Sequence, residues 1–398
     1  MRLSRLDRGT GAAAACVALL ALALAGCGSG NGSDGTSPAG ASTGTGTGSG
    51  TATTSRYTTP LKGLCPSTVV VQTSWWPEAD QGFTYQLLGP NPTIDKNKNR
   101  VIGQLGGTGV NLEIRSGGPA AGYQQPSALL AQDDNILLGY VGTDEAIQNS
   151  GKAPTVAVFS SYDRNPEVFL WGDPSWNFTS IADIGRSGAP VLAYAAASSV
   201  DVLEREGLLN KSQVDPSYQG SPDRFVAADG KIVQHGFVTN EPYHLEHDVK
   251  AWNKPVKYLL VDEYPVYQSA LSIRQDKLAA NSACLAKLVP LFQQAQSDYV
   301  AAPGPTNQLL LDIVSKMNTS GFSLSAGLVA DASAKQKELK LIANGSDGVL
   351  GSFDTARVQG LIGRLTPVFK AKGTEPKAGL APADLVTNQF LDKSISLK

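Results

Sequence analysis

The sequence predicts an α/β protein whose folded body is divided into two lobes. Short runs rich in β-branched residues recur along the chain and alternate with helical patterns, which is typical of sheets with largely parallel strands. The chain after residue 63 is longer than the ~250 to 300 residues at which a single hydrophobic core stops growing. The formal net charge is −2, and no basic run is interleaved with aromatic residues, so no nucleic-acid partner is expected.

The first 26 residues have the pattern of an export signal. Three arginines lie among the first eight residues, and residues 11–25 form an apolar segment shorter than the ~20 residues of a membrane-spanning helix. This segment ends in Leu-Ala-Gly directly before Cys27, which resembles a bacterial lipobox. The resemblance implies cleavage before Cys27 and a lipid anchor on that cysteine. A plain secretory signal with an incidental cysteine is the alternative.

The chain between the signal and the body is expected to be a flexible tether, residues 27–63. Residues 28–55 are all Gly, Ser, Thr, Ala, Asn, Asp or Pro, a composition that cannot form a core. Cys16 leaves with the signal and Cys27 carries the lipid, so Cys65 and Cys284 remain. In an oxidising compartment two such cysteines suggest one disulfide, with two separate buried thiols as the alternative.

The elements of the body are predicted from hydrophobic patterning. Strands are expected at residues 68–72, 110–114, 136–141, 155–159, 191–194, 232–238 and 257–261. Helices are expected at residues 275–300, 306–317 and 334–343. A last helix is expected to follow the N-cap Asp354 and to carry Val358, Leu361, Ile362 and Leu365 on one face. The last third of the chain is therefore predicted to be mostly helical.

Ligands of open α/β sheets bind beyond the carboxyl ends of the strands, so the residues after each predicted strand are the candidates for function. Four stretches stand out, at residues 73–78, 115–119, 142–145 and 240–243. In the first, the adjacent Trp75 and Trp76 cannot both point into one core, so one is expected to pack and the other to face a ligand. Both rings covering a lobe edge is the alternative. Glu78 follows them, and Tyr85 lies on the next predicted helix.

The second and third stretches offer polar groups. Arg115 provides a cation, and Gly117 with Gly118 forms a turn whose backbone can approach a ligand; a simple turn with Arg115 bridging the lobes is the alternative. Thr143 is expected to be the N-cap of a helix whose first turn carries Asp144 and Glu145. Unless they face solvent, these two acids argue against an anionic ligand at that helix end.

The fourth stretch turns out of the strand expected at residues 232–238. Glu241 follows Asn240 at the exit, and Pro242 suits the first position of the helix that Tyr243 begins. At such a corner Glu241 either caps the helix or accepts hydrogen bonds from an amino-bearing ligand, and the two roles are evenly matched.

The order of these motifs resembles the substrate-binding proteins of ABC importers, in the branch for thiamine pyrimidine precursors, nitrate, sulfonates and taurine. The similarity covers residues 69–275 and rests on Trp-Trp-Pro-Glu, Gly-x-x-Tyr, Val-Asn-Leu-Glu-Ile-Arg-Ser-Gly-Gly-Pro, Gly-Tyr-Val-Gly-Thr-Asp-Glu and Gly-Phe-Val-Thr-Asn-Glu-Pro-Tyr. It implies a two-lobed periplasmic-binding-protein fold of type II, with two crossovers and a ligand cleft that closes by hinge motion. Lobe 1 is expected at residues 64–173 and 265–398 and lobe 2 at residues 174–264. An insertion at residues 91–109 departs from the pattern.

The resemblance also implies roles and partners. A small-molecule ligand, an ABC permease and its ATPase are the expected partners of a monomer that needs no cofactor and lies on the extracytoplasmic face of the cell membrane. In the cleft, the implied contacts are aromatic from Trp75 or Trp76 and Tyr85, and polar from Gly117, Gly118, Thr143 and Glu241.

The residue types predict the ligand class. Aromatic rings at Trp75, Trp76, Tyr85 and Tyr243 with carboxylates at Glu78, Asp144 and Glu241 suit an amino-bearing heteroaromatic such as a pyrimidine. Arg115 favours the alternative, an anion of the sulfonate or nitrate type.

Other functions fit the sequence less well. An enzyme is not expected, because the sequence has no motif of an activated Ser or Cys nucleophile. A metal site at His244 and His247 is not expected either, since a histidine pair without a third imidazole is usually solvated. A ligand-sensing lipoprotein that is not coupled to transport is a further alternative, which the sequence does not separate from an importer protein.

Overall fold

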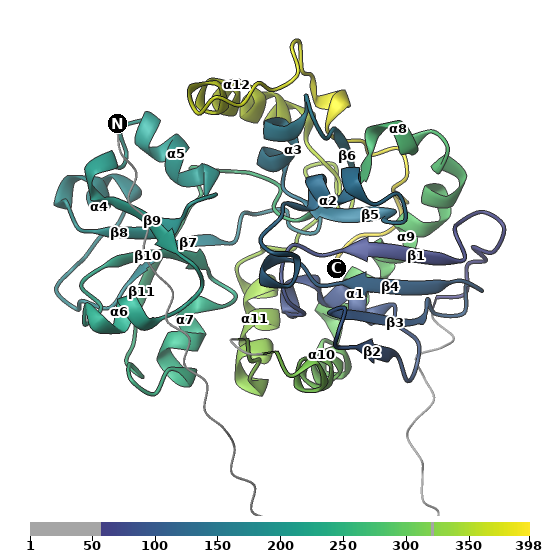
Figure 1. The fold of residues 1–398 in the computed structure, drawn as a ribbon, viewed down its shortest axis with the longest axis horizontal. Helices are drawn as coiled ribbons and strands as arrows, with labels where there is room; N and C mark the ends of the chain where they lie inside the picture. The colour runs from purple at the N-terminus through teal and green to yellow at the C-terminus, as the bar shows by residue number, and fades with distance from the viewer. Residues whose placement is uncertain (1–56, 320–321) are drawn as a thin grey trace, which may run out of the picture. The chain divides into compact units, whose positions relative to one another are not determined.

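The computed structural model describes residues 57–319 and 322–398. The export signal, Cys27 and the low-complexity stretch at residues 28–55 lie outside these ranges. Within the unit Thr51–Lys398, the described chain forms two β-sheets with helices around them (Figure 1). No helix of the described residues is both long and apolar enough to cross a membrane.

The first sheet has seven strands in the order β2-β3-β4-β1-β5-β12-β6. They are β1 Thr68–Gln72, β2 Thr93–Asp95, β3 Arg100–Gln104, β4 Asn111–Arg115, β5 Leu138–Val141, β6 Thr155–Phe159 and β12 Ala270–Arg274. β1 runs parallel to β4 and β5, and β12 is antiparallel to β5 and β6. The carboxyl ends of β1, β4 and β5 therefore lie at one edge, as the strand-end argument requires.

The second sheet has five strands in the order β11-β7-β10-β8-β9. They are β7 Glu167–Trp171, β8 Val191–Tyr194, β9 Val214–Tyr218, β10 Val233–Phe237 and β11 Lys257–Leu260. β8 is parallel to β9 and β10, and β7 is antiparallel to β10 and β11. The lobe boundary expected at residue 173 is wrong in one respect, because β7 lies before it and pairs within the second sheet.

The chain passes between the two sheets twice, at residues 160–166 and 261–269, which we call the crossovers. Their side chains and backbones are bonded to each other. Asn165 Nδ2 donates to Tyr264 O at 2.9 Å, and Ser161 Oγ donates to Ser269 O at 2.7 Å. Two crossovers between two sheets agree with the predicted architecture.

The helices and the short connections follow the sequence with some shifts. The α-helices are α1 Gly82–Gln86, α2 Pro126–Gln132, α3 Thr143–Asn149, α4 Ile181–Ser187, α5 Ser198–Arg205, α6 Asp223–Ala227, α7 Glu241–Tyr243, α8 Gln275–Leu278, α9 Ser282–Ala301, α10 Gly304–Met317, α11 Ala326–Glu338 and α12 Thr355–Ala371. The predicted N-cap of α12 is confirmed, since the Asp354 side chain accepts from two backbone N–H groups. The helix expected at residues 334–343 is wrong in its bounds, because Ser325 caps α11 by accepting from Leu328 N.

The insertion at residues 91–109 has a structure of its own. It forms the hairpin of β2 and β3, and β3 pairs with β4, so the insertion extends the edge of the first sheet. Asn99 has φ of 47° at the hairpin turn, a left-handed conformation that asparagine tolerates better than most residues.

A disulfide joins Cys65, at the start of the described chain, to Cys284 on α9, with a Cα–Cα distance of 4.8 Å.

α12 packs on helices that follow strands of both sheets. Its Leu361 and Leu365 share an apolar cluster with Ile147 of α3 and Leu203 of α5. The last long helix therefore adds to the two crossovers in holding the sheets together.

Candidate ligand-binding site

The carboxyl ends of the parallel strands in the two sheets meet. Trp75, just after β1, lies against Tyr194 at the end of β8, with ring centroids 6.4 Å apart and an interplanar angle of 77°. A second contact joins the same two edges: Asp80, which follows Trp75 in the turn after β1, accepts a hydrogen bond at Oδ2 from Thr239 Oγ1, just after β10, at 3.1 Å. In an α/β fold this edge is where ligands bind.

Three carboxylates lie at this junction, and we call Glu78, Asp80 and Glu241 the acid cluster. Burial raises the pKa of each of them. The pKa of Glu78 is raised well above its ordinary value, first by burial and then by the negative charges of Asp80 and Glu241. Among the described residues, none of the three forms an ion pair with a lysine, arginine or histidine, although His235 lowers the pKa of Glu241 from nearby. The cluster is therefore a concentration of carboxylates without a cation bonded to it.

Local structure places the first two acids. Glu78 is the N-cap of the short 3-10 helix η1 Ala79–Gln81, and Gln81 Nε2 donates back to Glu78 Oε1 at 3.4 Å. Asp80 accepts from Gln336 Nε2 of α11 at 3.4 Å in addition to Thr239. A turn after β1 therefore presents two carboxylates to the second sheet.

Glu241 reaches the junction from the second sheet. Its carboxylate turns back to β10, where it accepts from Phe237 N at 2.7 Å and from Tyr218 OH at 3.1 Å. A Cβ at Gly236 would lie 2.5 Å from Glu241 Cδ, so the carboxylate holds this position only opposite a residue without a side chain. The helix α7 begins at Glu241, one residue earlier than expected, so Pro242 is its second residue and not its first.

The two adjacent tryptophans take different roles. Trp76 is buried and stacks on Phe322, with ring centroids 5.9 Å apart. Trp75 is half-buried and contacts Tyr123 and Tyr194. A Cβ at Gly118, whose φ is +56°, would overlap the Trp75 ring, and one at Gly117 would overlap Thr73 O. The glycine turn thus makes room for Trp75, the less buried of the two tryptophans.

Tyr85 is fully buried, and its hydroxyl is buried with the ring. That hydroxyl has no hydrogen-bond partner among the described residues. Burial and the neighbouring Tyr140 and Glu78 raise the pKa of Tyr85 well above 10. Tyr140 differs, because its hydroxyl is bonded to Thr84 Oγ1 at 2.5 Å.

Arg115 is not brought to the acid cluster by any described contact. Its Nε lies 2.6 Å from Glu113 Oε1 and its Nη1 lies 2.6 Å from Asp133 Oδ2. The guanidinium is therefore already paired with two carboxylates, one on β4 and one at the end of α2.

The expectation that Thr143 caps α3 is wrong. Gly142 is the N-cap, and Thr143 Oγ1 instead accepts from Tyr267 N at 3.0 Å. Asp144 and Glu145 are half-buried and bonded: Asp144 Oδ2 accepts from Tyr264 OH at 3.1 Å and Glu145 from Ser127 N at 2.8 Å. Burial and the charge of Glu167 raise the pKa of Asp144, and burial raises that of Glu145 to about 7.

Tyr243 contacts neither Trp75 nor the acid cluster in any described interaction. Its hydroxyl lies against Gly327 of α11, where a Cβ would overlap it, and its ring lies 4.3 Å from that of His247.

In the described chain, no three His, Cys, Asp or Glu side chains are grouped as metal ligands.

The structure adds residues that the sequence reasoning missed. They are polar or aromatic side chains around the acid cluster: Asp80, Tyr140, Tyr194, Tyr218, Gln234, His235, Thr239 and Gln336. Tyr194 ends a predicted strand, so the strand-end argument was sufficient to find it. Tyr218 ends β9, a strand that Pro216 concealed in the sequence.

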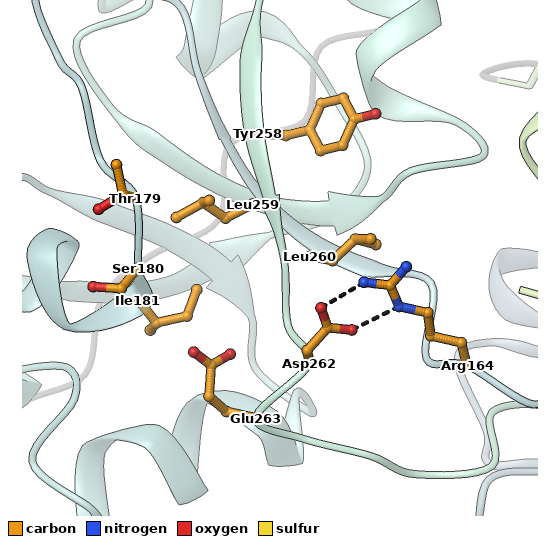
Figure 2. A pocket seen from close by; sticks show the side chains of 9 residues that line it. All are labelled: Arg164, Thr179, Ser180, Ile181, Tyr258, Leu259, Leu260, Asp262 and Glu263. Carbon is orange, nitrogen blue, oxygen red and sulfur yellow. Dashed lines mark hydrogen bonds and ion pairs between the residues drawn. The ribbon is translucent and has the colours of Figure 1, made fainter. Parts of the chain in front are cut away.

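A separate pocket of about 350 Å³ lies at the edge strand β11 (Figure 2). Its lining residues come from the crossovers, from β11 and from the start of α4: Arg164, Thr179, Ser180, Ile181, Tyr258, Leu259, Leu260, Asp262 and Glu263. Arg164 and Asp262 are joined there by two hydrogen bonds, of 2.7 and 2.5 Å (Figure 2). None of the predicted site residues lines this pocket.

Comparison with known proteins identifies the fold. No protein-family model matches the sequence, and no curated protein sequence matches it. The structure is similar to the periplasmic aliphatic sulphonate-binding protein SsuA from Escherichia coli, with TM-score 0.51 and 16% identity over 79% of this chain and 90% of that chain. It is also similar to the alkanesulfonate-binding protein SsuA from Xanthomonas axonopodis pv. citri bound to MOPS, with TM-score 0.51 and 13% identity over 81% of this chain and 99% of that chain. These likenesses show the periplasmic-binding-protein fold and confirm the predicted fold class.

Proposed function

We propose that this chain is an extracytoplasmic solute-binding lipoprotein that captures a small molecule and delivers it to an ABC importer. The observation that carries the proposal is the meeting of strand ends from two sheets at Trp75, Tyr194 and the acid cluster. Two sheets joined by two crossovers are the architecture of proteins that close on a ligand. The proteins of similar fold are periplasmic binding proteins, which supports a binding role over an enzymatic one.

The ligand that the site supports best is an amino-bearing heteroaromatic, such as a pyrimidine precursor. Trp75 offers a partly exposed aromatic face, and the carboxylates of Glu78 and Glu241 are hydrogen-bond acceptors for amino groups. Aromatic stacking with a few directed polar contacts is the usual composition of a small-molecule site.

A sulfonate or nitrate-type anion is the second candidate, and the fold shared with the two SsuA proteins favours it. The contacts of Arg115 weaken this candidate, because its guanidinium is already held by Glu113 and Asp133. An oxyanion beside the acid cluster would also meet like charge at short range, which costs several kcal/mol.

The experiment is a fluorescence and thermal-shift titration of the full chain with aminopyrimidines, taurine, nitrate and alkanesulfonates. We expect aminopyrimidines to change Trp fluorescence and raise Tm, and Trp75→Ala to abolish the response. Trp176→Ala is the matched control, because Trp176 is also half-buried and packs on Phe178 away from the acid cluster. A response to sulfonates alone would favour the second candidate, and no response to any solute would count against a binding protein.

The proposed location depends on Cys27. We expect wild type in the membrane fraction of expressing cells and Cys27→Ala in the soluble exported fraction. Equal partition of the two proteins would contradict the lipid anchor while leaving solute binding untouched.

A further inference from the structure

We infer that the ligand carries a positive charge and that the acid cluster of Glu78, Asp80 and Glu241 holds this charge. The inference rests on the proposed function and deepens it, since it concerns the charge of the solute and not only its amino groups and ring. Two observations support it. Among the residues that the structure describes, the ionisable groups around the cluster provide no free cation, and buried amide oxygens next to the cluster accept no hydrogen bond.

The first observation is the absence of a balancing cation among the described neighbours. The ionisable groups that interact electrostatically or by hydrogen bonds with the cluster come from α1, β5, β8, β9, β10, α9 and the first crossover: Tyr85, Tyr140, Tyr194, Tyr218, His235, Tyr299 and Tyr162. The tyrosines are neutral or negative. His235 is the one basic group of this set, and its Nε2 is already 3.0 Å from Glu167 Oε2.

The second observation is independent of charge and concerns three glutamine side chains. Gln81, Gln234 and Gln336 are each at most 2% exposed. Their Nε2 groups donate to Glu78, to Tyr218 and to Asp80 respectively, so all three amides adjoin the acid cluster or its partner. The Oε1 atom of each has no donor among the described residues. Buried acceptors in native proteins are nearly always paired, so three together indicate a missing donor.

The two observations define one kind of ligand. Three carboxylates without a counter-charge and three amide oxygens without a donor form a surface rich in acceptors. A protonated amine, an amidinium or an aminated heteroaromatic cation supplies both the charge and several N–H donors. Hydrogen bonds between ionised partners are about twice as strong as neutral ones, and pairing removes the cost of unpaired buried carboxylates.

The test uses three isosteres with different charges: benzamidinium, benzamide and benzoate. Each is titrated into the full chain by calorimetry near neutral pH. We expect benzamidinium to bind at least about tenfold more tightly than benzamide, and benzoate to show no binding. Benzamide or benzoate binding as tightly as benzamidinium would overturn the inference and leave solute binding intact.

Variants test whether the acid cluster causes the preference for the cationic isostere. In Glu78→Gln/Glu241→Gln we expect the preference for benzamidinium over benzamide to fall below about twofold, because neutral amides replace the carboxylates. Glu375→Gln, which changes an exposed acid outside the junction, keeps the preference. If the double variant does not fold, the comparison of the three isosteres in wild type decides alone. An unchanged preference in a folded double variant would overturn the assignment.

A second arm separates this inference from the proposed function. If no isostere binds, wild type is incubated with a pooled small-molecule extract, washed and analysed by mass spectrometry, with Trp75→Ala as control. A cationic solute retained only by wild type supports the inference, and a neutral or anionic one overturns it while the binding function stands. If wild type retains no solute, the proposed function fails and the inference fails with it.

Discussion

The two sheets are joined in two regions that differ in how their polar groups are satisfied. At the crossovers, Arg357 of α12 donates Nε to Pro265 O at 2.6 Å and Nη2 to Val266 O at 2.9 Å, both in the second crossover. Its Nη1 donates to Asp163 O of the first crossover at 2.6 Å. In the part of the chain that the structure describes, no lysine or arginine is bonded to the acid cluster in this way. The difference teaches that the polar groups of one region are bonded by the protein itself, whereas the other region is where we propose that a ligand binds.

Further contacts reinforce the crossover region. The guanidinium of Arg357 lies 3.8 Å from the centroid of the Tyr267 ring, and Arg164 and Asp262 form a bidentate pair between the crossovers. Charge-assisted bonds of this geometry hold the bonded groups in a fixed orientation. A side chain of α12 therefore ties both connections between the sheets to one helix.

The largest effect is expected from removing this cation. Arg357→Ala should lower the free energy of unfolding by about 3 kcal/mol, because three backbone carbonyls lose a charged donor. Arg357→Lys should recover part of the loss, since an ammonium does not reproduce the planar arrangement of donors. Urea denaturation measures both variants.

Arg364 provides the matched control on the same helix. It pairs with Glu206 of α5 through two hydrogen bonds of 2.9 Å and donates Nη1 to one crossover carbonyl, Glu263 O, at 2.7 Å. Both side chains of the ion pair are about one-third exposed. Arg364→Ala should cost at most about 1 kcal/mol, because partly exposed ion pairs contribute little. Equal losses for the two arginines would show that the three bonds of Arg357 to both crossovers stabilise the fold no more than the single crossover bond and ion pair of Arg364.

Neutralising the acid cluster should have the opposite sign. The folded-state pKa values of Glu78 and Glu241 are raised above their ordinary value of 4.5. The stability that such groups contribute is present below their unfolded pKa and is lost as pH rises through the folded pKa. Glu78→Gln/Glu241→Gln should therefore be more stable than wild type by about 2 kcal/mol at pH ~8, with little difference at pH ~4.

Urea denaturation at several pH values, without ligand, tests this expectation. Glu375→Gln should follow the wild-type pH profile, since its side chain is 74% exposed. Destabilisation of the double variant by the same amount at every pH would mean that the bonds of Glu241 to Phe237 N and Tyr218 OH outweigh the cost of its charge.

Much of the fold was predictable because periodic apolar runs determine strands. β1, β6 and β8 have the predicted bounds, whereas β7 and β12 were not predicted although both are largely buried. β9 was missed as well, because Pro216 and Asp215 interrupt its pattern. Parallel pairing of β1 with β4 and β5 then placed the residues after those strands at one edge.

The candidate site was only partly predictable. The positions of Glu78 and Glu241 after strands brought them to the junction, and the adjacency of Trp75 and Trp76 predicted that only one of the two would be buried. Partners distant in sequence were not predictable: Asp133 binds Arg115 from 18 residues away, and Gln336 reaches Asp80 from 256 residues away. Which polar groups are left without a partner depends on such long-range contacts, so the inference of a cationic ligand could not be drawn from the sequence.

The smallest change in the free energy of unfolding is expected at Tyr85. Its hydroxyl and that of Tyr218 provide a comparison between an unbonded and a bonded group near the acid cluster. The Tyr85 hydroxyl is buried without a partner, whereas that of Tyr218 bonds both Glu241 and Gln234 at 3.1 Å. Tyr85→Phe should leave the ligand-free protein unchanged or raise its free energy of unfolding by up to about 1 kcal/mol, because a desolvated unpaired group is removed. Tyr218→Phe should lower it by about 1 kcal/mol or more, because Glu241 loses a donor. Thermal and urea denaturation of both variants decide, and a loss at Tyr85 as large as that at Tyr218 would mean that the Tyr85 hydroxyl is satisfied in solution.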